Sequence, residues 1–245
     1  MKRPGRPTAS RRTLLKAGAG AALTTAATTG ATLDKPTKGH TVSGYHLSGV
    51  SLKKTFYKGR PAHVITMPSS EYQDPETEVL TDRDFMAWQE LDFGDGTIDV
   101  DVAGVLAPDA PFYARGFIGV AFRIGTDPEM SFESIYLRPT NSRAEDQVRR
   151  NHSIQYWAYP DHPFGRLRQE SPEKYESYVD IEPDAWTHMR IEVRGAQAKL
   201  FVNHADQPSL VVNDLKLGDR QRGGIGLWIE SGTVGYFSRL RVREA

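Results

Sequence analysis

Short stretches in which apolar and polar residues alternate recur along most of the chain, and this period of two residues constrains the fold more than any other feature. Successive side chains of a strand point to opposite faces, so each stretch predicts a strand with one buried face. Ten stretches follow the pattern: Pro61–Met67, Thr97–Val102, Phe117–Ile124, Phe132–Arg138, Ser153–Tyr159, His188–Val193, Ala198–Val202, Leu210–Val212, Ile225–Ile229 and Val234–Val242. Only Asp82–Glu90 and a turn within Ala144–Arg149 are modest candidates for helix, because neither sustains an apolar 3.6-residue repeat. We therefore predict an all-β protein.

Residues that tolerate positive φ punctuate these strands. Gly94-Asp95-Gly96, Arg194-Gly195 and Gly223-Gly224 favour the tight turns of hairpins. Many short strands within residues 50–245, with no second linker between them, suit one two-sheet antiparallel β-sandwich better than two domains. We expect a jelly roll.

The N-terminal residues indicate export. Ser10-Arg11-Arg12-Thr13-Leu14-Leu15-Lys16 resembles the twin-arginine export motif, and the small-residue stretch Ala17–Ala31 that follows is too short and too weakly apolar to hold a bilayer permanently. Small residues at Thr29 and Ala31 fit cleavage after Ala31. The resemblance implies transient partnership with the twin-arginine translocase, a periplasmic or extracellular location and no stable membrane insertion.

These features divide the chain into three parts. We expect a twin-arginine signal peptide over residues 1–31, a polar linker over 32–49, and a β-sandwich domain over 50–245. Six of the 31 Lys and Arg residues precede the first acidic residue, Asp34, so after cleavage 31 − 6 = 25 basic residues face 31 acidic ones, a net charge of −6. That balance gives no global attraction to nucleic acid. The absence of cysteine fits a protein that folds before export.

Alternation also divides the side chains between two faces. In Phe117–Ile124 the even-numbered apolar residues would enter the core, which leaves Arg123 outside. For Ser153–Tyr159 both parities stay open, and we favour the one with Trp157 outward. The outward set has the chemistry of a sugar cleft, since flat rings cover the C–H faces of a pyranose while guanidinium and amide groups bind its hydroxyls. This set comprises Arg123, Tyr136, Arg138, Gln155, Trp157 and Trp228. An ordinary solvated sheet face that carries strand-favouring aromatics is the alternative.

Residues 138–152 hold the densest cluster of functional groups and join two predicted strands, so they should lie at one end of the sandwich. Arg149 and Arg150 suit the clamping of a carboxylate or sugar acid. His152, with Asp146 or the nearby Glu133, suits proton transfer. The candidate catalytic residues are therefore Glu133, Asp146 and His152. The candidate substrate-binding residues are Arg123, Tyr136, Arg138, Asn141, Arg150, Asn151, Gln155 and Trp157. A set of surface ion pairs is the alternative for this loop.

Several C-terminal segments resemble the closing strands of concanavalin A-like lectin/glucanase domains: Ala185–Gly195, Ala198–Val202, Gly224–Trp228 and Val234–Phe237. They are most similar to the laminin-G-like bacterial branch that includes the 3-keto-disaccharide hydrolase domain family, and Phe93–Val102 and Gly119–Arg123 share this likeness. The resemblance implies a carbohydrate partner and, for that branch, oxidised 3-keto sugars. The Glu-x-Asp-x-x-Glu spacing of laminarinase-like glucanases is absent from the predicted strands, which argues against a retaining glucanase of that type.

The chain's histidines lack the i,i+4 pairing that signals a zinc site, so we expect no catalytic metal and no cofactor; a structural calcium ion held by carbonyls stays open. We expect an exported carbohydrate-active protein that acts on a glycoside or 3-keto-glycoside in a cleft on one sheet face. A non-catalytic, lectin-like or cell-envelope carbohydrate-binding domain is the second hypothesis, and a structural or protein-binding sandwich is the third.

Overall fold

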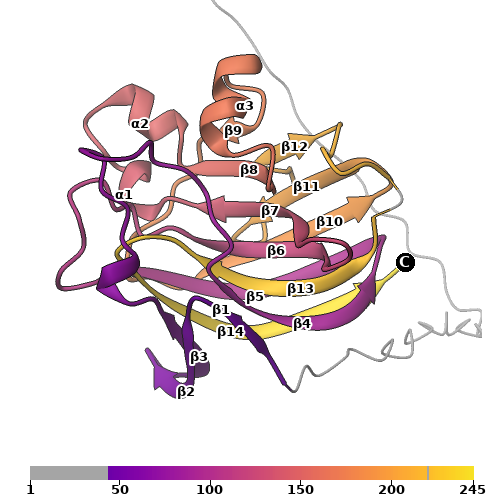
Figure 1. Cartoon of the computed structure of the whole chain (residues 1–245), viewed down its shortest axis with the longest axis horizontal. Helices are drawn as coiled ribbons and strands as arrows, with labels where there is room; N and C mark the ends of the chain where they lie inside the picture. Colours follow the sequence, from indigo (N-terminus) through magenta and orange to yellow (C-terminus); the bar gives the residue numbers. More distant parts are fainter. Residues whose placement is uncertain (1–43, 220) are drawn as a thin grey trace, which may run out of the picture. The chain divides into compact units, whose positions relative to one another are not determined.

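Fourteen strands form two antiparallel sheets in the computed structural model, which describes residues 44–219 and 221–245 (Figure 1). Sheet A has the order β1 (His46–Ser48), β4 (Met86–Phe93), β13 (Gly223–Ile229), β6 (Ile118–Gly125), β7 (Ser131–Leu137), β8 (Ile154–Tyr159) and β9 (Glu176–Ser177). Sheet B has the order β12 (Leu210–Val212), β11 (Gln197–Val202), β10 (Thr187–Arg194), β5 (Gly96–Leu106), β14 (Thr233–Glu244), β3 (Arg60–Thr66) and β2 (Ser51–Tyr57). The predicted two-sheet antiparallel β-sandwich of jelly-roll type is confirmed.

Strand pairing defines the start of the domain better than the polar composition of residues 32–49 does. β1 lies inside the stretch assigned to the linker, and its residues pair with Met86–Trp88 of β4, so the paired strands begin before residue 50. The expected signal peptide, residues 1–31, and residues 32–43 of the expected linker lie outside the described residues.

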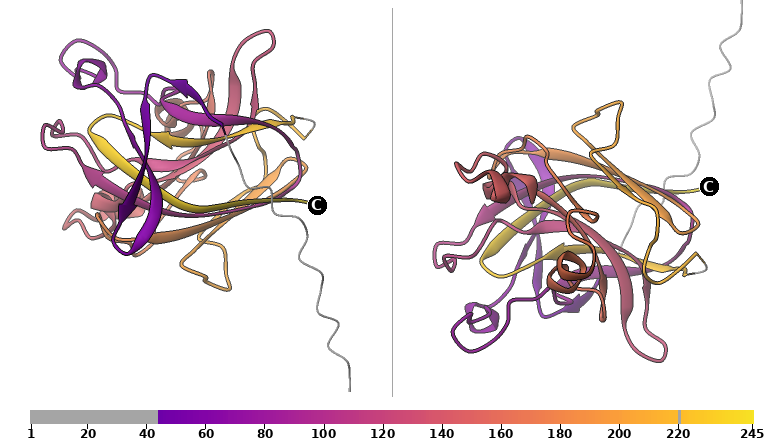
Figure 2. Two further views of the ribbon diagram at one scale, coloured as in Figure 1. Left: turned by 90° about the horizontal axis from the view of Figure 1, so that it is seen from below. Right: turned by 90° about the horizontal axis from the view of Figure 1, so that it is seen from above.

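The helices are short and lie in connections. α1 (Pro139–Ser142) and α2 (Gln147–Asn151) occupy the connection from β7 to β8, α3 (Phe164–Glu170) follows β8, and the 3-10 helix η1 (Ser69–Glu71) follows β3. Seen in Figure 2, these connections gather outside the two packed sheets. None of the helices in the described residues is long and apolar enough to cross a membrane.

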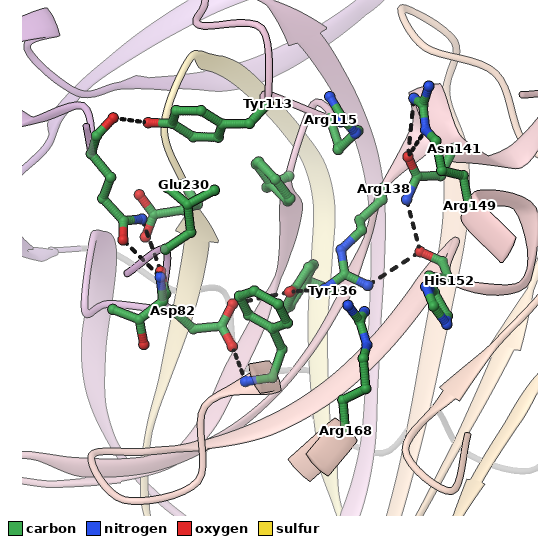
Figure 3. Close-up of a pocket in the computed structure, with 15 residues that line it drawn as sticks. Asp82, Tyr113, Arg115, Tyr136, Arg138, Asn141, Arg149, His152, Arg168 and Glu230 are labelled. Carbon is green, nitrogen blue, oxygen red and sulfur yellow. Dashed lines mark hydrogen bonds between the residues drawn. The ribbon is translucent and has the colours of Figure 1, made fainter. Parts of the chain in front are cut away.

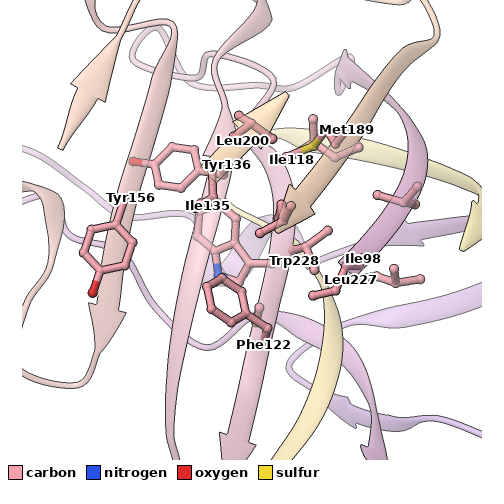
Figure 4. Packing of buried hydrophobic residues seen from close by; sticks show 14 of the residues in the cluster. Ile98, Ile118, Phe122, Ile135, Tyr136, Tyr156, Met189, Leu200, Leu227 and Trp228 are labelled. Carbon is pink, nitrogen blue, oxygen red and sulfur yellow. The ribbon is translucent and has the colours of Figure 1, made fainter. Parts of the chain in front are cut away.

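The inner faces of the two sheets form the core (Figure 4). Ile118, Ile135 and Leu227 of sheet A meet Ile98 and Met189 of sheet B, and all are 3% exposed or less. These β-branched and long apolar side chains occupy alternate positions of their strands, as the alternation predicts.

The outer face of sheet A is buried as well. Its aromatic rings pack on one another, with ring centroids 4.7 Å apart between Tyr136 and Trp228, 5.6 Å between Trp157 and Trp228, and 5.1 Å between Phe132 and Trp157. The segment that leads into β4 crosses this face in Figure 1 and accepts a hydrogen bond of 2.6 Å from Trp228 Nε1 at the carbonyl of Arg83. The expected open aromatic platform is therefore wrong: the parity of Trp157 is right, but Trp157 and Gln155 have no exposed surface.

Arg123 does not face solvent as the alternation predicts. The register of β6 shifts between Phe122 and Gly125, and Arg123 adopts a φ of 56°, so a bulge removes its side chain from the alternating pattern. Its guanidinium is fully buried and donates to the carbonyls of Gly94, Gly195 and Gly218 and to Asp95 Oδ1. Arg123 is thus a structural anchor and not a ligand-binding residue on an open face.

Three further expectations need correction. Asp82–Glu90 forms no helix, and its second half, residues 86–90, belongs to β4. Residues 86–89 are all buried, so this part of the strand lacks the alternation that marks a half-buried strand. Gly94-Asp95-Gly96 links β4 of sheet A to β5 of sheet B and closes no hairpin, whereas Arg194-Gly195 does join the hairpin of β10 and β11. Gly223-Gly224 lies within β13, at a register shift.

Candidate functional site

A cavity of about 220 Å³ opens where β7 leads into α1, at the end of the outer face of sheet A (Figure 3). Its walls come from six parts of the chain: the segment before β4, the loop before β6, the end of β7, the α1–α2 region, α3 and the residue that follows β13. Polar and charged residues and aromatic rings alternate around it. The lining residues are Gln73, Leu80, Thr81, Asp82, Tyr113, Arg115, Phe117, Tyr136, Arg138, Asn141, Arg149, His152, Phe164, Arg168 and Glu230.

Asp82 is the buried acid of the cavity. Its Oδ1 accepts a 2.9 Å hydrogen bond from Tyr136 Oη, and its Oδ2 accepts a 2.7 Å bond from the backbone N–H of Phe164. Burial raises the pKa of Asp82 to about 7, although the Phe164 amide, Arg138 and Tyr136 act in the opposite direction. A substantial fraction of this carboxyl group is therefore protonated at neutral pH.

Arg138 connects the cavity to a second buried acid, Glu176. Arg138 Nη2 donates to Tyr136 Oη at 2.7 Å and to Gln155 Oε1 at 3.2 Å, and its Nη1 lies 3.2 Å from Glu176 Oε1. Arg168 Nε donates to Glu176 Oε2 at 3.0 Å. Burial alone would raise the pKa of Glu176, but Arg168 and Arg138 outweigh it and lower that pKa. Glu176 therefore stays ionised, and its single negative charge is shared between the two arginines.

His152 stands beside Glu176, with 3.5 Å between its Nε2 and Glu176 Oε2. Burial lowers the pKa of His152, Arg168 and Arg138 lower it further, and Glu176 opposes them. The imidazole is therefore neutral at pH 7 and able to accept a proton.

Among the residues that the structure describes, the side chains of Arg115 and Arg149 have only neutral partners. Arg115 Nη1 donates to the carbonyls of Phe112 at 2.9 Å and Ala114 at 2.8 Å. Arg149 donates through Nε and Nη2 to Asn141 Oδ1, each at 3.3 Å, and Asn141 Nδ2 donates to the carbonyl of His152. Burial lowers the pKa of Arg115, and the positive charges of Arg149 and Arg138 lower it further.

The structure brings Tyr136, Arg138, Asn141 and His152 of the predicted set together at this cavity. Gln155 lies beneath it and accepts from Arg138. The other predicted loop residues lie elsewhere. Asp146 caps α2 by accepting from the N–H of Arg149, Arg150 donates to Tyr178 Oη, and the exposed Asn151 accepts from Gln147.

Glu133 lies on the opposite face of sheet A, inside the sandwich. Its Oε1 accepts from the N–H of Leu217 at 2.8 Å and its Oε2 accepts from Tyr156 Oη at 2.5 Å. Burial raises its pKa. The expected convergence of Glu133 with His152 on one rim is contradicted. The signal was present in the sequence, because Glu133 shares the parity of the core residue Ile135.

Several residues that line the cavity are not predicted as site residues by any pattern in the sequence. Asp82 was read as part of a helix, and Arg115, Phe164 and Arg168 lie in connections with no pattern that marks a site. Tyr113 lies in a loop, and at the cavity its hydroxyl donates to the carbonyl of Gln73, 40 residues away. No group of three or more His, Asp or Glu within residues 44–219 and 221–245 is placed to hold a metal ion.

No family model matches the chain, and no curated protein matches it. The chain is similar to a solved protein of unknown function with a galectin-like fold from Bacillus subtilis, with 11% identity over 82% of this chain and 98% of that one and a TM-score of 0.48. It is similar to the carbohydrate-binding module CBM66 from Bacillus subtilis, with 11% identity over 79% and 94% and a TM-score of 0.41. The Caenorhabditis elegans galectin LEC-6 gives 9% identity over 67% and 95% and a TM-score of 0.39. With TM-scores below 0.5, none of these similarities bears on the function of this chain.

Proposed function

We propose that the protein binds a carbohydrate in the cavity at the end of sheet A. The observation that supports this proposal is that aromatic rings and fixed hydrogen-bonding groups line the same small cavity, with the partly exposed Phe117 and Phe164 among the rings and Arg138 and Asn141 among the donors. Rings of this kind cover the C–H faces of a sugar, and the donors reach its hydroxyl groups. A volume of about 220 Å³ is below that of pockets for drug-sized ligands, so it suits one sugar ring or the end of a chain.

The polar groups are held in place before a ligand arrives. Arg138 is fixed by Tyr136, Gln155 and Glu176, and Asn141 is fixed by the carbonyl of His152. Groups that are already ordered lose little conformational entropy on binding, which favours affinity from few contacts.

Cleavage of a glycoside or 3-keto-glycoside is the second candidate function, and Asp82 is the observation that favours it. A carboxyl group with a pKa of about 7 is suited to act as a general acid at neutral pH. In that reaction the proton of Asp82 passes to the glycosidic oxygen as the C–O bond breaks. A water molecule adds to the anomeric carbon and gives its proton to the neutral imidazole of His152.

We also propose that the protein is exported by the twin-arginine route and meets its glycan outside the cytoplasm. The paired Arg11 and Arg12 and the lack of cysteine support this proposal. Exchange of both arginines for lysine should retain the precursor in the cytoplasm. Cell fractionation that shows unchanged export of this variant would reject the export proposal.

The binding proposal is tested by calorimetric titration of the full chain with a panel of mono- and oligosaccharides that includes 3-keto forms. Phe117→Ala should weaken binding 10- to 100-fold, as expected for loss of an anchoring ring worth about 1–3 kcal/mol. Phe112→Ala is the matched control, because this ring is 84% exposed on the same loop and lies outside the cavity lining. Equal affinities for wild type and Phe117→Ala, or no binding to any sugar of the panel, would reject the proposal.

The catalytic candidate is tested by turnover of the same sugars. Asp82→Asn should lower turnover by about 10²–10⁴-fold if this carboxyl is the acid. Sugar binding by a wild type without measurable turnover would leave the binding function and exclude cleavage of those substrates.

A further inference from the structure

We infer that the sugar bound in this cavity carries a negatively charged substituent, a carboxylate or a sulfate ester, and that Arg115 and Arg149 hold it. The inference rests on the proposed carbohydrate binding and adds the chemical class of the ligand. It follows from the balance of charge around the cavity.

Four guanidinium groups and two carboxyl groups line the cavity. One of the carboxylates, Glu230, is already bound by Arg83, whose Nη2 lies 2.5 Å from Glu230 Oε1. The other, Asp82, is half neutral near pH 7. Glu176, behind the cavity wall, serves Arg138 and Arg168. Glu230 and Glu176 are thus already paired with arginines. Together with the partly protonated Asp82, they neutralise only part of the positive charge of the four guanidinium groups.

Arg115 and Arg149 are the two cavity arginines whose charge is not paired with a carboxylate of the described residues. Within the described residues neither forms an ion pair, and their hydrogen bonds go to backbone carbonyls and to the amide oxygen of Asn141. Half-buried cations that lack a counter-charge are unfavourable, and the lowered pKa of Arg115 reflects its repulsion by Arg149 and Arg138 in addition to its burial. An anion between them relieves this repulsion.

The placement of the charges gives the ligand an orientation. In Figure 3, Arg115, Arg138 and Arg149 lie on one side of the cavity, and Asp82 and Glu230 lie on the other. A planar guanidinium offers paired N–H groups that match the oxygens of a carboxylate or sulfate. The anionic substituent therefore lies on the arginine side, and the hydroxyl groups of the ring face Asp82.

Arg150 serves as a matched control for Arg149. The two residues are neighbours on α2, but Arg150 lies 5.3 Å from the ring centroid of Tyr178 and donates to its hydroxyl, outside the cavity lining. Loss of its charge changes the net charge of the protein by the same amount, so it separates local binding from general electrostatic attraction.

The test is calorimetric titration of the full chain with three sugars: methyl glucoside, methyl glucuronide and the 6-sulfate of methyl glucoside. Wild type should bind at least one of the two anionic sugars tenfold or more tightly than the neutral one, and this preference should shrink as salt is added. Whichever anionic sugar binds more tightly identifies the carboxylate or the sulfate ester as the preferred substituent. Arg149→Gln should lose several-fold more affinity for the anionic sugar than for the neutral one, whereas Arg150→Gln, which removes the same single charge, should keep the wild-type ratio. The double variant Arg115→Gln with Arg149→Gln should lose at least tenfold more affinity for the anionic sugar than for the neutral one.

A second variant keeps the test usable if the first one does not fold. If melting shows that the glutamine double variant is unfolded, Arg115→Lys with Arg149→Lys keeps the charges, removes the paired N–H geometry and should lower the ratio in part. Equal wild-type affinity for neutral and anionic sugars would overturn this inference and leave the proposed function standing. Absence of binding to all three sugars and to the wider panel would overturn both. A ratio that falls equally in the Arg150 variant would assign the preference to general electrostatic attraction and overturn the role of Arg115 and Arg149.

Discussion

Asp82 makes the stability of the folded chain depend on pH. Its pKa is about 7 in the folded state against an ordinary value of 3.8, so the folded state holds this proton more tightly than the unfolded state. Between pH 4 and pH 7 the folded state therefore binds more protons, and the free energy of unfolding falls as pH rises through this range. The difference corresponds to a contribution on the order of 4 kcal/mol, which is present below pH 4 and lost above pH 7.

Asp82→Asn should remove this dependence. The amide has one acceptor oxygen in place of two, so it can accept only one of the bonds from Tyr136 Oη and the Phe164 N–H. Because it is never charged, the melting temperature of the variant minus that of wild type should rise between pH 5 and pH 8. Thermal melts across this range provide the measurement. Parallel curves for the two proteins would show that Asp82 is ionised throughout.

Trp157 is a second residue for which burial predicts a role, here in the stability of the fold. The ring has no exposed surface and contacts Phe132, Tyr159 and Trp228. Trp157→Ala should therefore lower the free energy of unfolding by about 3–5 kcal/mol, as for other large-to-small changes in a core. Denaturant unfolding measures this value, and a loss below about 1 kcal/mol would mean that the ring is open to solvent.

At the scale of elements, β6 and β7 approach each other closely at Gly119. A Cβ atom on Gly119 would lie 2.4 Å from the carbonyl oxygen of Ile135 and 2.4 Å from Tyr136 Cβ. The strand that carries Tyr136 and Arg138 into the cavity can therefore take its position only because residue 119 has no side chain.

Gly119→Ala should destabilise the fold by about 1–3 kcal/mol, in the range of overpacked sites, and should weaken sugar binding because Tyr136 must shift. Gly165→Ala in α3 is the control, since its added Cβ meets nothing within 4 Å and alanine favours helix. Denaturant unfolding and titration of both variants make the comparison. Wild-type stability of Gly119→Ala would show that β7 yields without strain.

The strands that the sequence pattern predicts correctly are those with one buried apolar face and one polar face. β10 reads Thr-His-Met-Arg-Ile-Glu-Val-Arg with strict alternation and is exposed on one side, so the pattern locates it. β4 is buried on both faces over residues 86–89 and carries no such pattern. β1 and β9 are too short to show any period. Four of the candidate site residues line the cavity, and they come from one predicted strand and the connection that follows it. The bulge at Arg123 and the burial of Trp157 depend on tertiary contacts that no local pattern records.

At the scale of the whole molecule, Arg123 ties the two sheets together. It extends from β6 of sheet A to the turn before β5 and to the turn between β10 and β11, both of sheet B, and also reaches the carbonyl of Gly218. One buried guanidinium thus satisfies three backbone carbonyls and Asp95.

Arg123→Met keeps the apolar stem and removes every one of these bonds. The unpaired buried carbonyls should lower the free energy of unfolding by about 3 kcal/mol or more, at 1–3 kcal/mol for each unsatisfied group that water does not reach. Arg194→Met is the control, because Arg194 is exposed at the end of β10. Denaturant unfolding of the two variants should differ by that amount, and similar midpoints would show that the sheets do not need this tie.

The order of the strands also decides where the protein is vulnerable to self-association. Within the described residues, sheet A ends in strands of three and two residues, and β12 at one end of sheet B has three, whereas β2 at the other end has seven. A long outermost strand is a template on which another extended chain adds by backbone pairing, the first step toward fibrils. The adjacent, exposed Lys53 and Lys54 lie in the middle of β2, so two copies that meet edge to edge must bring four ammonium groups together. This charge repulsion keeps the longest edge of the sandwich from becoming a seed for aggregation.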